Sequence, residues 1–326
     1  MKKILYITLT VILFTWSFTA LAAGDDPLVE KKKTYSKSYT VGSNEKISLN
    51  NSFGEMKFST WDKNEVKVDI VIIAKAATDE KAQEILNKIR IEDGKNSGGV
   101  YFKTQMDNMN NNNNNNNNNS DNNKNGNANK KKGKNYKQEG MEINYMVYLP
   151  ASNPLDASNS FGALIIGDYK GEASLESKFG SLTAGNLANV KQVSVEFGKA
   201  DVAAIHNGKV TIKFSKAVLG KFSGNVNSNF EFCEVVNLGL DNSIAQLNIR
   251  SSYSTLGIEL NKGLSASFNI KTSFGDVDNN SAFDIKEEDD GGQKHGPRFD
   301  KQYYGTAGQG NAKITIKSEF GTVKLL

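Results

Sequence analysis

The chain has few of the residue types that build disulfides, metal sites and nucleophilic active sites. Its 326 residues include one cysteine, Cys233, and two histidines, His206 and His295, in dissimilar contexts. A single cysteine excludes an internal disulfide, and so few Cys and His side chains nearly exclude zinc sites. No Gly-x-Ser-x-Gly motif occurs, and no glycine-rich phosphate loop leads from a strand into a helix. We therefore predict no catalytic residue, no metal and no cofactor, and we expect Cys233 to be a small buried hydrophobe.

The amino terminus has the pattern of a secretory signal. Lys2 and Lys3 precede an apolar run from Ile4 to Phe18, and small residues follow at Ala20-Leu21-Ala22. This pattern predicts a signal peptide over residues 1–22. The run is short for a membrane span and nothing later resembles one, so we predict an exported protein without a transmembrane segment, in the periplasm or on the outer cell surface.

The charge balance gives no sign of a nucleic-acid partner. The chain has 40 basic and 36 acidic residues, and loss of Lys2 and Lys3 with the signal leaves 38 basic residues. A balance this close to neutral argues against a protein that binds nucleic acid.

One pattern of apolar and polar residues recurs around an aromatic side chain. The position four residues before the aromatic is always apolar, and the positions three and one before it are always polar, as in a half-buried strand. Spacings of 16 to 23 residues in the central part of the chain are typical of stacked supersecondary units. The aromatic residues are Phe53, Phe161, Phe179, Phe197, Phe214, Phe230, Tyr253, Phe274 and Phe320.

Two further columns complete the unit. Glycine follows the aromatic in six copies, and apolar residues resume three positions after it, which predicts a bend between two strands. Two positions before the aromatic, seven of nine residues are small and polar, and we expect these to face inward and hydrogen-bond to their copies in neighbouring strands. By the same alternation we expect the aromatic side chains to stack inside the coil. The seven residues are Asn51, Asn159, Ser177, Ser228, Ser251, Thr272 and Ser318.

These patterns predict an all-β fold with one short helix: a parallel β-solenoid over residues 151–326 with a strand and helix cap over residues 23–150. An ordinary β-sandwich is the alternative. The helix is expected over residues 78–90, with Thr78 as its N-cap. Residues 107–138, rich in Asn and Lys, are expected to be a disordered loop. Its lysines could attract polyanions, or the loop could be a solvated segment without a specific partner. The insertion over residues 281–310 is expected to fold over the last strand and cover its edge.

Outward apolar residues are the best candidates for a contact surface. Ile165, Val218 and Phe232 occupy positions where other units carry mainly polar side chains, and Val218 and Phe232 could form a patch if their strands were adjacent. Outward carboxylates at Asp201, Asp276 and Asp278 belong to separate units, and we interpret them as solvated charges. The acidic run over residues 287–290 lacks the spacing of a calcium loop and has the same interpretation.

Several segments together resemble a known family. Asn51-Ser52-Phe53-Gly54, Trp61-Asp62-Lys63-Asn64, Tyr148-Leu149-Pro150-Ala151 and residues 314–321 are similar to bacterial β-strand-repeat proteins of the "putative adhesin" type, which are common in Bacteroidota and carry a domain of unknown function. The resemblance implies a β-solenoid in the cell envelope and implies no catalytic residues. The long Asn tract departs from the shorter linker of that family.

Three functions remain open on the sequence. The first is a non-enzymatic envelope protein that binds or scaffolds through a β-solenoid surface, with an unidentified protein or glycan as partner. The second is a periplasmic sensory or regulatory partner in envelope signalling. The third is a polysaccharide-active β-helix enzyme, which would need two carboxylates on adjacent strands.

Overall fold

The computed structural model describes residues 28–107, 139–288 and 299–326, and this part of the chain is nearly all β. It contains 21 strands in one large sheet and one helix, so the prediction of an all-β fold with a single helix is confirmed. No helix in these ranges has the length and apolar character needed to cross a membrane. The predicted signal peptide, residues 108–138 of the predicted loop, and residues 289–298 lie outside the described residues.

Each unit consists of a strand, an aromatic corner and a second strand. The first two units are β2 (Ile47–Ser52) with β3 (Met56–Trp61), and β8 (Leu155–Ser160) with β9 (Ala163–Ile166). In the central units, the second strand of one unit continues into the first strand of the next. The central strands are β10 (Tyr169–Lys178), β11 (Ser181–Glu196), β12 (Lys199–Lys213), β13 (Lys216–Glu231) and β14 (Val236–Ser252).

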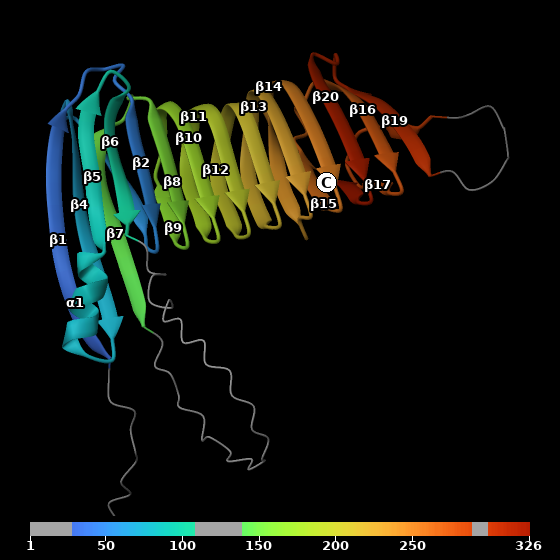
Figure 1. Cartoon of the computed structure of the whole chain (residues 1–326). Helices are drawn as coiled ribbons and strands as arrows, with labels where there is room; N and C mark the ends of the chain where they lie inside the picture. Colours follow the sequence, from blue (N-terminus) through green and yellow to red (C-terminus); the bar gives the residue numbers. More distant parts are fainter. Residues whose placement is uncertain (1–27, 108–138, 289–298) are drawn as a thin grey trace, which may run out of the picture.

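Successive units pair in parallel and in register. Leu175 lies opposite Val193, which lies opposite Val210, and the same column continues to Ser228 and Ile249. All five side chains are buried and form one line of the core. Four of them come from the apolar column of the sequence pattern, whereas Ser228 was assigned to the small polar column. Figure 1 shows these strands side by side, from β8 at the cap to β14 near the carboxyl end. Parallel pairing stacks equivalent side chains at the strand spacing of about 4.8 Å.

The carboxyl-terminal strands do not stack in chain order. β20 (Ala312–Glu319) lies between β14 and β16 (Ala266–Ser273), and β21 (Thr322–Leu325) lies between β15 (Thr255–Leu260) and β17 (Asp276–Asn279). The last unit of the sequence is therefore inserted before the previous one. Each of these units carries the same columns, so nothing local in the sequence distinguishes one neighbour from another.

Part of the predicted insertion covers the open sheet edge at the carboxyl-terminal end of the stack. β19 (Asp300–Ala307) pairs antiparallel with β16, and β18 (Ile285–Glu287) pairs antiparallel with β19. The expectation that the insertion covers the final strand is wrong, because the chain's last strands lie inside the stack. The insertion covers β16, whose backbone would otherwise be an open edge.

The amino-terminal segments form a cap of mainly antiparallel strands. β1 (Val29–Thr40) pairs with β4 (Glu65–Ala76), β4 pairs with β7 (Gly140–Pro150), and β7 joins the stack through β3. β5 (Ile89–Asn96) pairs with β6 (Gly99–Met106), which joins the stack through β2.

The helix α1 (Asp79–Asn87) packs on this cap, against β1 and β4 (Figure 1). Its N-cap is Thr78, whose Oγ1 accepts a hydrogen bond from the Lys81 amide at 3.3 Å. Ala82 and Leu86 bury the apolar face. The helix is shorter than predicted, because Ile89 begins β5 and is buried there as a strand residue.

Within the small polar column, only the asparagine side chains form hydrogen bonds in the described ranges. The Asn51 amide donates to Asn159 Oδ1 at 3.1 Å, and Thr104 donates to Asn51 Oδ1 at 2.8 Å. The hydroxyls of Ser177, Ser228, Ser251, Thr272 and Ser318 are buried without a hydrogen-bond partner among the described residues. The prediction is wrong for these hydroxyls. Ser228 lies between Val210 and Ile249, which offer no side-chain hydrogen bond. Ser251, Ser318 and Thr272 are neighbours, but such short side chains do not span the distance between strands.

Candidate functional site: the aromatic corner

Ten aromatic rings form one continuous stack along the molecule, which we call the aromatic ladder. Neighbouring ring centroids are 4.8 to 5.1 Å apart, and all pairs except Phe274 with Phe299 are parallel within 6°. The spacing equals that of the strands, because nine of the rings sit at the same corner of their units and Phe299, just before an antiparallel strand, extends the stack by one ring. In spatial order the ladder is Phe53, Phe161, Phe179, Phe197, Phe214, Phe232, Tyr253, Phe320, Phe274 and Phe299.

The ladder lies on the outside of the molecule, so the prediction that the rings stack inside is wrong. Phe161, Phe179 and Tyr253 are each 50% exposed, and the other rings are similar except Phe53, which is more buried. Strand alternation would place the aromatic on the inner side with the residue two before it. The corner residues instead have φ between 48° and 65°, and this left-handed conformation turns the side chain outward.

Two members of the ladder were not predicted: Phe299, which stacks on Phe274 at the end of the ladder, and Phe232. Phe232, and not Phe230, stacks between Phe214 and Tyr253. Phe230 is fully buried, between Ile212 and Ser251 of the neighbouring strands. The signal that could have identified Phe232 is its spacing of 18 residues from Phe214, the same as the spacing from Phe161 to Phe179.

The glycines after the ladder residues are required by a close approach of backbones. A Cβ on Gly180 would lie 2.0 Å from the carbonyl oxygen of Gly162, and a Cβ on Gly162 would lie 1.9 Å from that of Gly54. The glycine therefore allows neighbouring corners to approach closely, whereas the left-handed turn of the backbone occurs at the aromatic residue before it.

Three units have another residue in place of this glycine: Ser215, Cys233 and Ser254. Ser254 Oγ accepts from the Cys233 amide at 2.9 Å, and Ser215 Oγ accepts from the Gly198 amide at 2.9 Å. Cys233 occupies the glycine position of its unit, because the ladder residue is Phe232. The Cys233 thiol is buried, and burial raises its pKa, so it is a neutral thiol as expected for a packing residue.

The three predicted contact residues do not come together as one patch. Val218 in β13 is 50% exposed and lies opposite Asp201 and Asn237. Phe232 is part of the ladder, and Ile165 in β9 is only partly exposed, opposite Lys57 and Thr183. Phe232 is thus joined to other aromatic rings and is not paired with Val218.

The outward carboxylates remain separate. Asp201 lies opposite Thr183 and Val218, Asp276 forms an ion pair with Lys301, and Asp278 lies opposite Lys324. In the described part of the chain, no group of three or more His, Cys, Asp and Glu side chains is arranged to hold a metal ion. His206 Nδ1 contacts Ser223 Oγ at 3.0 Å, on the exposed surface.

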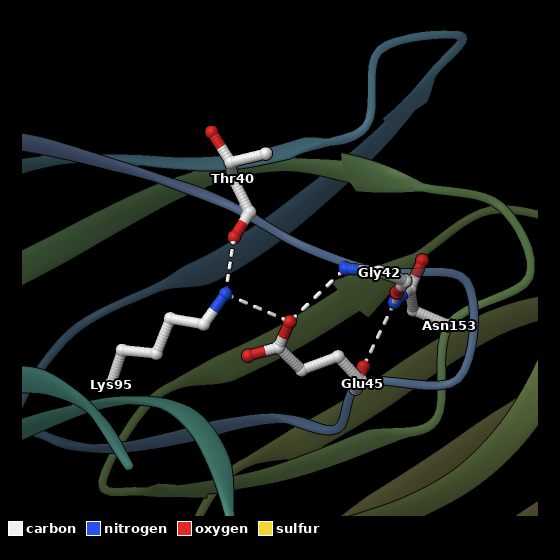
Figure 2. A network of polar contacts seen from close by, with 5 residues as sticks. All are labelled: Thr40, Gly42, Glu45, Lys95 and Asn153. Atoms are coloured by element: carbon white, nitrogen blue, oxygen red, sulfur yellow. Dashed lines mark hydrogen bonds and ion pairs between the residues drawn. The ribbon is translucent and has the colours of Figure 1, made fainter.

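A polar network at the cap fixes the turn between β1 and β2 (Figure 2). Lys95 Nζ lies 2.9 Å from Glu45 Oε2 and 2.8 Å from the Thr40 carbonyl oxygen. The Gly42 amide donates to the same Glu45 oxygen at 3.0 Å, and this bond, with Lys95, lowers the pKa of Glu45. The buried Asn153 amide donates to the carbonyls of Gly42 and Glu45 at 2.7 and 2.8 Å. Every group has a structural partner, so the network anchors the turn to β5 and to the segment before β8.

A second polar group in the cap joins β1 to β5. The hydroxyls of Tyr35 and Tyr39 both donate to the Asp93 carboxylate. The bond to Asp93, with burial, raises the pKa of Tyr39 to about 12. Burial, followed by the bond to Asp93, raises the pKa of Tyr35. Both phenols therefore stay protonated as donors at neutral pH and hold the outer strand of the cap.

Comparisons with known proteins give distant structural similarities. No protein-family model matches the chain, and no curated protein sequence matches it. A putative cell adhesion protein from Clostridium sporogenes is 16% identical with a TM-score of 0.25, covering 90% of this chain and 99% of that one. A putative adhesin from Bacteroides fragilis is 13% identical with a TM-score of 0.34, covering 90% of this chain and 97% of that one.

Proposed function

We propose that this chain is a non-enzymatic, adhesin-like binding or scaffolding protein of the cell envelope, exported to the periplasm or the cell surface. Its stacked units are proposed to form a β-solenoid. The observation that carries the proposal is the aromatic ladder, an exposed apolar stripe that runs about 44 Å along the strand-stacking direction. Contiguous apolar surface of this extent is typical of a contact site.

The backbone at the ladder supports a role for the rings. A left-handed conformation costs a residue with a side chain about 1 to 2 kcal/mol, and glycine or asparagine would adopt it with less strain. Nine aromatic residues of the ladder nevertheless have this conformation. Stacking stabilises each pair of rings by about 0.5 to 1.5 kcal/mol, which is about as much as the strain costs. Stacking alone therefore gives no net gain in stability. An apolar surface for a partner explains why aromatic residues occupy these corners.

The geometry of the rings favours a protein partner. Neighbouring rings cover each other's faces, so the ladder exposes ring edges to solvent. A sugar ring that stacks on an aromatic side chain needs a free face. Ring edges along a ridge instead suit insertion between the apolar side chains of another protein surface.

Adhesion by purified protein tests the proposal. Beads coated with the wild-type chain are expected to adhere to intact bacterial cells. The triple variant Phe179→Asn, Phe197→Asn, Phe214→Asn is expected to lose most of this adhesion, because asparagine tolerates the left-handed conformation but removes the apolar stripe. Val218→Asn is the matched control, since Val218 is equally exposed but lies outside the ladder.

Circular dichroism and thermal unfolding of each variant show whether the fold is kept. Equal adhesion by wild-type and folded triple variant would contradict the role of the ladder. Absence of adhesion by the wild-type chain would contradict the adhesive function. A strictly periplasmic pool with one co-purifying partner would favour the sensory or regulatory function in its place.

A further inference from the structure

A shallow groove of about 700 Å³ lies beside the ladder, on the outward face of β12, β13, β14 and β20. These strands are neighbours in the stack (Figure 1). Ten of the twelve lining residues stand one, three or five positions before the ladder aromatics and point outward from each strand. The other two, Ser228 and Ile249, are buried and lie at the bottom of the groove. Equivalent positions therefore form continuous columns along the stacking direction.

The middle column carries an excess of positive charge. Arg250 in β14 lies opposite Lys317 in β20, and Lys317 lies opposite Lys271 in β16. All three side chains are exposed, and none forms an ion pair within the described ranges. Lysine and arginine side chains directly opposite one another repel. A negatively charged ligand that ran along this column would relieve the repulsion.

The rest of the lining adds little negative charge. Glu231 is the acidic residue that lines the groove, and its charge is compensated by Lys213 at 2.8 Å. Lys209 lines the groove without an ion pair in the described part of the chain. Glu319 is on the same face as Lys317 but does not line the groove. The groove is thus a net basic surface.

Amide and hydroxyl groups lie beside these charges. Asn227 and Asn248 occupy the next column and form a hydrogen bond to each other at 2.9 Å, followed by Thr315 on the adjacent strand. Thr211 and Asn229 precede Arg250 in the middle column. Such groups both donate and accept hydrogen bonds, so they suit a ligand rich in hydroxyl groups.

We infer that this groove binds a polysaccharide that carries carboxylate groups, a polyuronate, extended along the strand-stacking direction. Arg250 and Lys317 contact carboxylates, and the amide and hydroxyl columns contact sugar hydroxyls. A nucleic acid fits less well, because the lining has no aromatic side chain on which a base could stack. The inference names a ligand for a surface other than the ladder, so it does not depend on the proposed adhesive contact.

Binding of polygalacturonate oligomers to the wild-type chain, measured by calorimetry at low salt, tests the inference. We expect polygalacturonate to bind, neutral dextran of equal length not to bind, and affinity to fall as salt is added. Lys317→Gln and Arg250→Gln are each expected to weaken binding about tenfold, or about 1.4 kcal/mol. Lys324→Gln is the matched control, because Lys324 is an exposed lysine on the other side of Phe320 in the same unit.

Three results would overturn the inference. The first is equal binding of dextran and polygalacturonate. The second is equally tight binding of an oligothymidylate of the same charge, which would indicate a general polyanion surface. The third is an equal loss of affinity in Lys324→Gln and Lys317→Gln. The triple asparagine variant of the ladder should bind polygalacturonate like the wild-type chain, so failure of the adhesive function is distinguishable from failure of this one.

Discussion

Phe230 and Phe232 are two residues apart, yet one is fully buried and the other is about half exposed. In a continuous strand they would share one face. The strand ends at Glu231, and φ of 53° at Phe232 turns its ring outward onto Phe214 and Tyr253. A single backbone dihedral thus separates a core residue from a surface residue, and the same change occurs at every corner of the stack.

Substitutions at Phe197 should separate backbone strain from stacking. Phe197→Asn is expected to change the free energy of unfolding by no more than about 1 kcal/mol, since relief of strain offsets the lost ring contacts. Phe197→Val is expected to destabilise by about 2 kcal/mol or more, because a β-branched residue resists a positive φ. Urea denaturation followed by circular dichroism measures both, and equal stability of the two variants would contradict this explanation.

A side chain at the corner glycine Gly180 should destabilise the fold. Gly180→Ala is expected to destabilise by about 3 kcal/mol or more, because overpacking against backbone cannot be relieved by a change of rotamer. Its Cβ would lie 2.0 Å from the Gly162 carbonyl oxygen, whereas a Cβ on Gly167 would meet nothing within 4 Å. Gly167→Ala is therefore the control, with an expected change within about 0.5 kcal/mol. Thermal unfolding of the two variants side by side checks the difference.

Two buried threonines should respond in opposite directions to replacement by valine. Thr272 has a buried hydroxyl without a partner among the described residues, so Thr272→Val should stabilise the fold by about 1 kcal/mol. Thr104 donates to Asn51 Oδ1 at 2.8 Å, so Thr104→Val should destabilise it by about 1 to 3 kcal/mol. Denaturant midpoints measure both effects. A loss of stability in Thr272→Val would show that its hydroxyl has a favourable interaction.

Stability should fall at alkaline pH through the cap tyrosines. The pKa of Tyr39 is raised from an ordinary value of 10 to about 12 in the folded chain, and that of Tyr35 is also raised. A raised pKa stabilises the fold fully below pH 10, and this contribution is lost as pH rises from 10 through 12. The free energy of unfolding should therefore decrease over this window, and less steeply in Tyr39→Phe. An unchanged slope in Tyr39→Phe would contradict this explanation.

The repeated strands could be predicted because a strand with one buried face has apolar and polar residues in alternation. Alternating apolar and polar positions before Phe179 and Phe197 are sufficient to define strands, and the glycine after each ring marks the close approach of neighbouring corners. The helix start at Thr78 could also be predicted, since its cap and first turn are local. The end of the helix could not, because Ile89 is apolar in either a helix or a strand.

The candidate sites were only partly visible in the sequence. Eight of the ten ladder residues were identified, and Phe232 and Phe299 were missed. The exposure of the rings depends on a dihedral angle that alternation does not encode. In the basic column, Arg250 lies opposite Lys317, which is 67 residues later in the chain. Lys317 in turn lies opposite Lys271, which is 46 residues earlier. Their proximity follows from the placement of β20 between β14 and β16.

The amino-acid sequence by itself determined that the chain is built of short strands with one inward face, separated by aromatic corners and capped by a helix, because these features depend on local periodicity and propensity. Only the tertiary structure decided which units are neighbours, which edge is covered, and that the rings lie outside. Units with equivalent columns can pair in more than one order, and their order is set by the summed packing of the whole stack.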